Sequence, residues 1–385
     1  MDIEIRGADF VNKGSELMLR AVIDELNNKC PEASLVIDAR VGSFLKRARL
    51  GLYQKPMRSE WKLGGAVIDL MWRKKTMERY GIRPANRIGV ILDASGFAYT
   101  DQFKAKITVK LARRLKKWKR EGKKVVLLPQ AFGPFKRKET REAMQTVVDH
   151  ADLIFPRDRD SYDHIVGLTG ERENVKIRPD FTNLVKGEKP AYFEANRRQA
   201  CLIPNFKMIE QTSEEVRKAY VPFFAECARY LMDAGLDPFL LVHEKKDGGL
   251  AVEVKEKSGL DMRIIEEDDP LLTKGIIGAS FLVVGSRYHG LVSALSQGVP
   301  TVATGWSHKY QLLYDDYGCK EFLISDLDFQ SRALPRLQQL MDEDRRKEIV
   351  EKIAEKATSQ VHETEMMWQE VLDLICPAAS SGRER

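Results

Sequence analysis

The sequence predicts an α/β protein with two Rossmann-like domains, each a doubly wound parallel sheet covered by helices. Three observations lead to this prediction. Short apolar strand candidates alternate with helical segments along most of the chain. Several candidates are apolar at consecutive positions, a pattern typical of strands that are buried on both faces. The alternation starts again near the middle of the chain, whose 385 residues exceed what one ordinary core accommodates.

The first predicted domain covers residues 1–190. Its first strand is followed by a helix that begins near Gly14, and the strand-to-helix order then repeats. Strands are expected at 2–8, 34–39, 87–96, 123–130, 151–158 and 175–180, and helices at 14–28, within 106–124, before 151 and at 161–168.

The second predicted domain covers residues 191–375 and follows a polar, proline-containing segment at 186–198. Residues 376–385 are interpreted as a frayed tail. Strands are expected at 200–205, 238–244, 262–267, 281–287 and 300–305, a long helix over about 213–234, and a heavily charged helix over about 342–375.

Composition limits the class of protein. The formal net charge of +6 is a mild excess, which permits an acidic substrate or peripheral contact with an anionic membrane. Nucleic acid is not expected as a partner, because no motif for binding it is present. No apolar run reaches the roughly 18 residues of a spanning helix, and the first residues do not form a secretory signal. The five scattered cysteines lack CxxC spacing, which indicates neither a disulfide framework nor a zinc site and favours a reducing cytoplasm.

The fold determines where site residues should be sought. Ligands of doubly wound sheets bind beyond the carboxyl ends of the strands. Two such domains in tandem are expected to face a cleft. Polar residues directly after predicted strands are therefore the candidates.

Asn12, Gly14 and Ser15 follow the first strand. Asn12 or Ser15 can cap the next helix, and Gly14 permits a tight turn. The N–H groups of that helix start would suit an anion or a hydroxyl. An ordinary strand-to-helix turn is the alternative.

Asp93, Ser95 and Gly96 stand at the exit of the strand at 87–96, and Gln130 ends the strand after it. Small residues let a ligand approach the backbone. Asp93 as a plain helix cap is the alternative. Prolines and a glycine around Gln130 predict a rigid turn there.

Arg157 and Asp158 end the strand at 151–158. Arginine is rarely buried without a partner, so Arg157 at a strand exit suggests contact with a ligand. A structural ion pair between Arg157 and an aspartate is the alternative.

Arg287 and His289 follow a buried strand, and an apolar helix begins at once. A phosphate or carboxylate there would meet a guanidinium fork, an imidazole and helix N–H groups together. Lys309, after the next strand, adds a cation to the same rim, with a solvated surface lysine as the alternative. This combination predicts an anion site.

Three other features are interpreted as structural. Asp269 before Pro270 is typical of a helix start, so the acidic run around it is not expected to hold a metal. The basic residues of 106–124 lie opposite an apolar stripe and are expected to be solvated, with contact to anionic lipid or glycan as the alternative. The apolar segment 60–75 is too short to span a bilayer, and it is a core element, a lid or an interfacial segment.

The chain resembles the polysaccharide pyruvyl transferase family. The resemblance runs through most of both predicted domains and is carried by residues 12–19, 127–135 and 155–161. It is carried above all by 283–313, where a strand leads into G-x-R-x-H, a small-residue helix, Gly-Val-Pro, a second strand and a lysine.

This resemblance implies a GT-B-like fold and the transfer of pyruvate from phosphoenolpyruvate to a sugar as a cyclic ketal, with release of phosphate. The sugar would belong to a cell-surface or extracellular polysaccharide, or to its lipid-linked precursor. Arg157, Arg287 and His289 are expected to hold phosphoenolpyruvate, together with Lys309 on the same rim. No cofactor or metal is expected. The acceptor is expected on the first domain, at Asn12, Gly14, Ser15, Ser95, Gly96 and Gln130.

The implied chemistry needs a proton donor and a base. The methylene carbon of the donor gains a proton, and the attacking hydroxyl loses one. His289 either delivers the proton or holds the phosphate. Asp93 and Asp158 are the candidate bases. The expected location is the cytoplasm, with peripheral association at the inner face of the membrane as a possibility that the resemblance allows.

Two other functions share this architecture. In a GT-B glycosyltransferase or other nucleotide-sugar enzyme, Arg287 and Lys309 would hold a pyrophosphate, although 243–249 offers no convincing carboxylate for a ribose. A non-catalytic glycan-binding or regulatory relative is the second, because Ser15, Glu16 and the stretch 93–96 depart from the family's usual loops. The sequence does not determine the acceptor sugar, its carrier or the oligomeric state.

Overall fold

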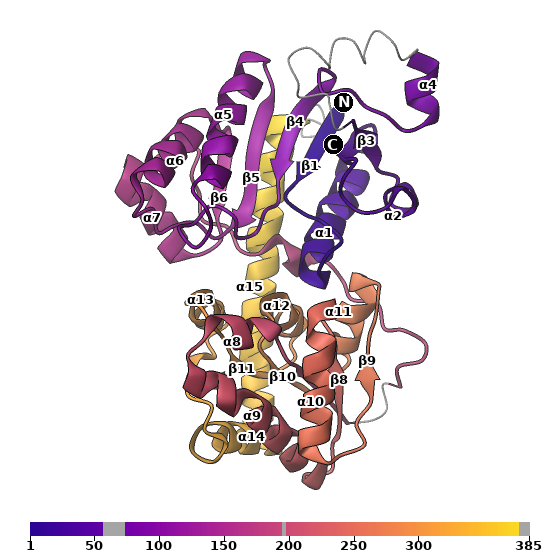
Figure 1. The fold of residues 1–385 in the computed structure, drawn as a ribbon, viewed down its shortest axis with the longest axis vertical. Helices are drawn as coiled ribbons and strands as arrows, with labels where there is room; N and C mark the ends of the chain where they lie inside the picture. The colour runs from indigo at the N-terminus through magenta and orange to yellow at the C-terminus, as the bar shows by residue number, and fades with distance from the viewer. Residues whose placement is uncertain (57–73, 195–197, 377–385) are drawn as a thin grey trace, which may run out of the picture. The chain divides into compact units, whose positions relative to one another are not determined.

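The computed structural model describes residues 1–56, 74–194 and 198–376 (Figure 1). They form two compact units. Unit 1 takes its described residues from Met1–Val11, Met18–Phe181 and Glu363–Arg385, and unit 2 takes them from Asn12–Leu17 and Thr182–His362. The short segment Asn12–Leu17 thus packs with unit 2, although the chain on both sides of it packs with unit 1.

Among its described residues, unit 1 contains a six-stranded parallel sheet in the order β3-β2-β1-β4-β5-β6. Its strands are β1 (Asp2–Arg6), β2 (Ser34–Asp38), β3 (Tyr53–Lys55), β4 (Ile88–Asp93), β5 (Lys124–Gln130) and β6 (Leu153–Pro156). Its helices are α1 (Lys13–Lys29), whose first turn packs with unit 2, α2 (Phe44–Arg49), α4 (Lys74–Arg79), α5 (Lys106–Arg120), α6 (Lys138–His150) and α7 (Arg159–Thr169), and the short turn η1 (Phe181–Leu184) follows.

The described part of unit 2 contains a second six-stranded parallel sheet, in the order β12-β11-β10-β7-β8-β9. Its strands are β7 (Gln199–Ile203), β8 (Asp237–Leu241), β9 (Ile264–Ile265), β10 (Leu282–Gly285), β11 (Thr301–Thr304) and β12 (Leu323–Ile324). Its helices are α8 (Phe206–Gln211), α9 (Glu214–Asp233), α10 (Gly248–Ser258), α11 (Pro270–Gly278), α12 (Tyr288–Leu295), α13 (Lys309–Asp316), α14 (Leu334–Met341) and α15 (Glu343–Ile375). The last part of α15 belongs to unit 1. Three short turns are η2 (Lys245–Asp247), η3 (Lys320–Phe322) and η4 (Phe329–Ala333).

Both sheets have the same strand order. Read from its other edge, the second sheet runs β9-β8-β7-β10-β11-β12, which repeats the pattern β3-β2-β1-β4-β5-β6 of the first. The direction of winding reverses between β1 and β4 and between β7 and β10, so each sheet has one switch point, which is the usual location of ligand sites in such sheets. The prediction of two Rossmann-like parallel sheets with a GT-B-like fold is confirmed.

The strands that sequence did not predict lie at sheet edges. β3 and β12 have three and two residues, too few for a periodic pattern to show. Conversely, the segment predicted as a strand at 175–180 contains only an isolated bridge between Val175 and Ile154. The predicted helix start at Asp269 is confirmed, because its side chain accepts the N–H of Leu271 and Pro270 is in the first turn.

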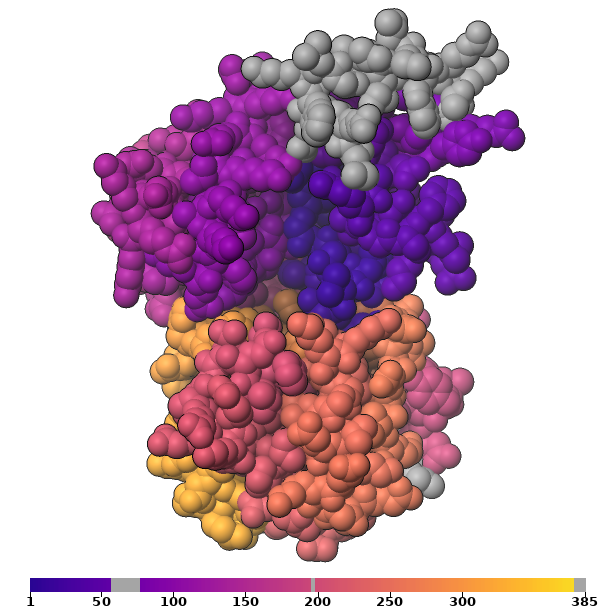
Figure 2. Space-filling view, in the orientation of Figure 1, coloured from indigo at the N-terminus to yellow at the C-terminus, as the bar shows by residue number. Residues whose placement is uncertain are grey.

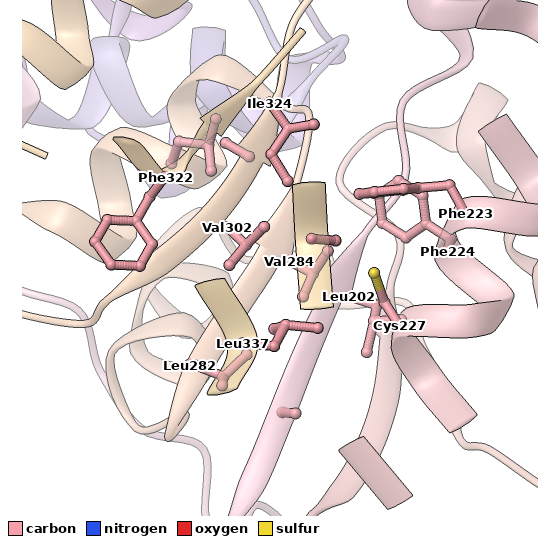
Figure 3. Packing of buried hydrophobic residues seen from close by; sticks show 14 of the residues in the cluster. Leu202, Phe223, Phe224, Cys227, Leu282, Val284, Val302, Phe322, Ile324 and Leu337 are labelled. Carbon is pink, nitrogen blue, oxygen red and sulfur yellow. The ribbon is translucent and has the colours of Figure 1, made fainter. Parts of the chain in front are cut away.

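The core of unit 2 explains the continuous apolar runs. Neighbouring residues of β7 point to opposite faces: Leu202 packs in the cluster that includes α9, and Ile203 packs in the cluster that includes α11. In Figure 3, Phe224 and Cys227 of α9 lie beside Leu202 and Val284. Side chains of α8, α9 and α10, rose to orange in Figure 2, cover the visible face of this unit. The strands are therefore buried on both faces, and their exits are where polar side chains gather.

The structure corrects the expectation that the cysteines form no disulfide. Cys30, directly after α1, forms a disulfide with Cys376, directly after α15, and their Cα atoms are 6.9 Å apart. The two residues are separated by 346 positions, so no local spacing reveals the pair. Cys201, Cys227 and Cys319 are free and buried.

Two sequence expectations concern residues that the structure does not describe. Most of the apolar segment 60–75 falls within 57–73, and the expected tail, apart from Cys376, falls within 377–385. In the described ranges, no helix combines the length and the apolar character needed to cross a membrane.

Candidate active site

The switch point of unit 2 is held by hydrogen bonds around Ser286, the first residue after β10. Asn205, two residues after β7, donates its side-chain N–H to the Ser286 carbonyl at 2.6 Å. Tyr310 donates its hydroxyl to the same carbonyl at 2.9 Å, and the hydroxyl of Tyr220 hydrogen-bonds the Ser286 hydroxyl. Three hydrogen bonds therefore fix Ser286, and this residue directly precedes Arg287.

Arg287 is bound by two carboxylates that follow β8. Its Nε and Nη2 donate to the two oxygens of Asp247 at 2.8 and 2.5 Å, and its Nη1 donates to Glu244 at 2.6 Å. Burial alone would lower the pKa of Arg287, but the hydrogen bonds and charges of Asp247 and Glu244 outweigh it and raise the pKa. Arg287 is thus a preorganised cation whose charge the protein itself already balances.

Asp247 anchors this cluster and is fully buried, whereas Glu244 keeps 17% of its side chain exposed. Asp247 also accepts the backbone N–H groups of Phe206 at 2.9 Å and Glu244 at 3.1 Å. Burial raises the pKa of Asp247, and the hydrogen bonds from Arg287 oppose that rise. Asp247 therefore positions Arg287, and Glu244 is the carboxylate nearer to solvent.

His289 packs against the first turn of α1, within unit 2. A Cβ atom added to Gly14 would lie 2.3 Å from Nδ1 of His289, closer than side chains approach. Asn12 caps this turn by accepting the Ser15 N–H at 2.9 Å. The structure thus brings Asn12, Gly14 and Ser15, predicted for the acceptor, together with His289, predicted for the donor.

A second histidine lies in the same region. His243 follows β8 and is buried, and a Cβ atom on Gly290 would lie 3.5 Å from its Cδ2. Burial lowers the pKa of His243 well below its usual range, and the charges of Arg287, His289 and Lys13 lower it further. His243 is therefore neutral at neutral pH. It can donate or accept a hydrogen bond, but it adds no positive charge to the site.

Lys309 lies among three aromatic rings. Its Nζ is 5.0 Å from the ring centroids of Tyr288 and Trp306 and 5.5 Å from that of Tyr310. Tyr288 also contacts His289 edge to face, with ring centroids 5.4 Å apart. Lys309 is partly buried against these rings, which connect it to His289.

In unit 1, Asp93 and Ser95 meet at the switch point between β1 and β4. Asp93 accepts the Tyr99 hydroxyl at 2.7 Å and the Ser95 N–H at 3.1 Å. Gly7, directly after β1, has a φ of 80°, and a Cβ atom there would lie 2.1 Å from the Ser95 hydroxyl. Burial, and then the charge of Asp93, raises the pKa of Tyr99 well above its usual range. The carboxylate of Asp93 is thus held between two donors.

Gly96 and Gln130 complete this group in unit 1. Gly96 has a φ of 66°, and its carbonyl accepts the Ala131 N–H at 3.0 Å. Gln130 is buried and donates its amide N–H to the carbonyls of Leu128 at 3.2 Å and Asp93 at 3.5 Å. Four of the predicted residues, Asp93, Ser95, Gly96 and Gln130, therefore lie together.

Arg157 and Asp158 have partners within unit 1. Nη1 of Arg157 is 3.6 Å from a carboxylate oxygen of Asp180, and both side chains are buried. Asp158 caps α7 by accepting the Ser161 N–H at 2.7 Å. The ion pair of Arg157 with an aspartate is the structural alternative considered for that residue, and the roles of Arg157 and Asp158 toward a ligand stay predictions.

A model of the polysaccharide pyruvyl transferase family matches residues 12–308. The matched range includes the start of α1, the residues Asp93, Ser95, Gly96 and Gln130 of unit 1, and Arg287 with its partners Glu244 and Asp247. The chain belongs to this family. No curated protein matches the chain over its sequence.

Solved structures of low sequence identity share the fold of this family member. The UDP-glucose complex of Anabaena Alr3699/HepE is 16% identical with a TM-score of 0.59, covering 97% of this chain and 100% of its own. UDP-GlcNAc 2-epimerase from Neisseria meningitidis, bound to UDP-GlcNAc, is 12% identical with a TM-score of 0.61 and the same coverages. A putative UDP-N-acetylglucosamine 2-epimerase from Listeria monocytogenes is 11% identical with a TM-score of 0.63, covering 97% and 95%.

Sequence reasoning missed several residues of this candidate site in the pyruvyl transferase family member. Asn205 follows β7, and His243, Glu244 and Asp247 follow β8. All four lie at or just after the ends of the strands predicted at 200–205 and 238–244, so the rule that selected Arg287 would have selected them too. The strand order was the missing information, because it places the exits of β7 and then β8 next to that of β10. Tyr220 and Tyr310 sit on helices and carried no signal of this kind.

Replacing Tyr99 by phenylalanine is expected to lower the free energy of unfolding by about 1–3 kcal/mol, because the buried Asp93 carboxylate loses a hydrogen-bond donor. Urea denaturation followed by circular dichroism measures this. Tyr80→Phe, at a ring that is 54% exposed, is the matched control and should change stability by less than about 0.5 kcal/mol. Equal stability of the two variants would contradict the role given to Tyr99.

Proposed function

We propose that the protein transfers pyruvate from phosphoenolpyruvate to two hydroxyls of a sugar as a cyclic ketal and releases phosphate. Membership of the pyruvyl transferase family supports the transfer. The observation that carries the choice of donor is the gathering of Arg287, His289 and Lys309 at neighbouring strand exits of unit 2. A guanidinium, an imidazole and an ammonium suit a donor that carries both a phosphate and a carboxylate.

The partners of Arg287 suggest how the donor is bound. Asp247 would keep Nε and Nη2 in place, because it is fully buried and is held by backbone N–H groups. Glu244, which is more exposed, would leave Nη1 and be replaced by an oxygen of phosphoenolpyruvate. The exchange would remove one negative charge from the neighbourhood of the cation as the anion arrives.

The reaction balances with two sugar hydroxyls. One hydroxyl proton ends on the methylene carbon of the donor, which becomes a methyl group, and the other leaves with the phosphate. The first oxygen bonds to the central carbon, and the second displaces the phosphate and closes the ring. His289 would deliver the proton to carbon or hold the phosphate. Glu244, once released from Arg287, is a base beside the donor, in addition to the predicted Asp93 and Asp158.

The acceptor is proposed to be a sugar of a polysaccharide or of its lipid-linked precursor, contacted by Ser95, Gly96 and Gln130 of unit 1. We place the reaction in the cytoplasm, at the inner face of the membrane when the acceptor is lipid-linked.

A nucleotide-sugar enzyme is the second candidate. The solved neighbours are described as complexes with UDP, UDP-glucose or UDP-GlcNAc. In this chain, Glu244 at the exit of β8 is a carboxylate that a ribose could use. Under this function UDP, rather than phosphoenolpyruvate, would occupy the Arg287 cluster.

The two functions are separated by ligand-induced melting shifts and by phosphate release. Phosphoenolpyruvate is expected to raise the melting temperature and UDP to leave it unchanged. With candidate galactosides or mannosides, phosphate should be released and the acceptor should gain pyruvate in its mass spectrum. His289→Gln should lower the rate at least about tenfold, through the loss of a contact made by a charged or proton-donating group.

His308→Gln is the matched control, because His308 is an exposed neighbour of Lys309 and its side chain does not cap α13. It should keep the wild-type rate. A melting shift with UDP alone would favour the nucleotide-sugar enzyme. Binding of phosphoenolpyruvate without phosphate release from any acceptor would favour a non-catalytic relative.

A further inference from the structure

Unit 2 has a cavity at the amino-terminal edge of its sheet, away from the strand exits that carry Arg287 and His289. Phe281, directly before β10, donates its N–H to the carbonyl of Gln199 at the start of β7. The first turns of α15 provide the opposite wall. The cavity has a volume of about 560 Å³, within the range of small-molecule sites. Its lining residues are Arg198, Phe281, Met341, Glu343, Arg346, Lys347 and Val350.

Two guanidinium groups gather at one aromatic ring in this cavity. The central carbon of Arg346 is 3.6 Å from the centroid of the Phe281 ring, and that of Arg198 is 4.6 Å from it. Burial, and to a smaller extent the like charge of Arg198, lowers the pKa of Arg346 to about 10. The protein thus holds two cations close enough to disfavour each other.

The described residues do not balance this charge. No carboxylate among them forms an ion pair with Arg198, Arg346 or Lys347. Glu343 is the one acidic residue in the lining, against three basic ones. This differs from Arg287, whose two carboxylates cancel its charge. A cavity with excess positive charge attracts anions.

Arg346 also has hydrogen-bonding capacity in reserve. Its Nη2 donates to the Phe281 carbonyl at 2.7 Å, which fixes the guanidinium on the ring. Its Nη1 is buried and has no hydrogen-bond partner among the described residues. Buried hydrogen-bond donors are almost always paired in native proteins. We therefore expect Nη1 of Arg346 to donate to an acceptor on a bound ligand. The flat fork of an arginine matches two oxygens of a phosphate.

We propose that this cavity binds a small phosphate-bearing anion through Arg198, Arg346 and Lys347, with Phe281, Met341 and Val350 contacting its less polar part. The site is separate from the proposed donor site. The four residues of β10 lie between Phe281 and Ser286, and the five residue steps from Phe281 to Ser286 span about 16 Å at the usual rise of a strand. The proposal does not depend on the activity of the enzyme, because it concerns a second ligand.

The test is isothermal titration of the full chain with inorganic pyrophosphate in a phosphate-free buffer. The double variant Arg198→Gln/Arg346→Gln is expected to bind pyrophosphate at this site at least about tenfold more weakly, since it loses two charge-assisted contacts. His289→Gln/Lys309→Met changes the proposed donor site and should leave this binding event in place. These two arms distinguish failure of this proposal from failure of the proposed function.

Arg345→Gln is the matched control. Arg345 is next to Arg346 and carries the same charge, but it is exposed and pairs with Glu348 at 3.1 Å. Its removal should leave the affinity within about twofold, as for a solvated charge. Arg198→Gln alone, at an exposed residue, covers the case in which the double variant does not fold, and it should weaken binding severalfold. Unchanged affinity in Arg198→Gln, or an equal loss in Arg345→Gln, would overturn the proposal.

Discussion

Replacing Arg287 by methionine is expected to lower the free energy of unfolding by about 3–5 kcal/mol and to reduce phosphate release by about tenfold to a hundredfold or more. The first effect arises because Asp247, which is fully buried, keeps its charge and loses its partner. The second arises because the proposed donor loses its guanidinium. Urea denaturation and a phosphate-release assay measure the two effects.

The loss of stability should depend on pH. Burial raises the pKa of Asp247 above its ordinary value of 3.8, and without Arg287 the pKa in the folded state rises further. A carboxyl whose pKa is raised in the folded state does not lower the free energy of unfolding when the pH is below its ordinary pKa. As the pH rises from the ordinary pKa toward the folded pKa, it lowers the free energy of unfolding progressively. The gap in stability between wild type and Arg287→Met should therefore shrink as the pH falls toward the ordinary pKa of 3.8.

Two further variants make this result specific. Arg263→Met removes an ion pair with Asp237 whose side chains are 44% and 38% exposed, and it should cost less than about 1 kcal/mol. The double variant Arg287→Met/Asp247→Asn also removes the buried negative charge of Asp247 that Arg287 would have balanced. It should regain part of the lost stability, but none of the lost activity. If Arg287→Met were as stable as Arg263→Met, the buried cluster would not have the energetic role assigned to it.

Replacing Gly14 by alanine is expected to slow phosphate release by about a hundredfold. The new methyl group would overlap His289, with 2.3 Å to Nδ1 and 2.6 Å to Cγ, so the imidazole must leave its position. Alanine is otherwise the better helix former by about 1 kcal/mol, so a loss of stability would itself report the overlap. Steady-state phosphate release and thermal unfolding are the measurements.

Gly167→Ala is the matched control for this substitution. Gly167 lies inside α7, and a Cβ atom there would meet nothing within 4 Å. It should raise stability by about 0.5–1 kcal/mol and leave the rate unchanged. Gly14→Ala/His289→Ala should recover stability but not activity, because the smaller side chain removes the overlap. Full activity in Gly14→Ala would mean that His289 is not the group that the reaction uses.

The sequence predicted the architecture well because buried parallel strands leave a strong signal. The long apolar runs that became β4, β5 and β10 needed no knowledge of their neighbours. The edge strands β3 and β12 depend on pairing with a neighbour and are too short to be recognised alone. The disulfide between Cys30 and Cys376 depends likewise on contacts between distant parts of the chain.

The site was predicted less completely, for a physical reason. Arg287 and His289 were found because a charged residue after a buried strand is unusual. Their partners were not, because the carboxylates of Glu244 and Asp247 come from another strand exit and meet Arg287 only through the order of strands. The expected assignment of Gly14 to the acceptor followed from its place in the chain, whereas its contact with His289 follows from how the first turn of α1 packs.

The segment Asn12–Leu17 has a consequence for anyone who recombines this gene. The chain passes from one unit to the other at residues 11–12, 17–18, 181–182 and 362–363, so no single junction separates them. A chimera joined at residue 182 would inherit Arg287 and His289 from one parent and Gly14 from the other. Functional exchange of halves between relatives should therefore require the six codons for residues 12–17 to travel with the second half.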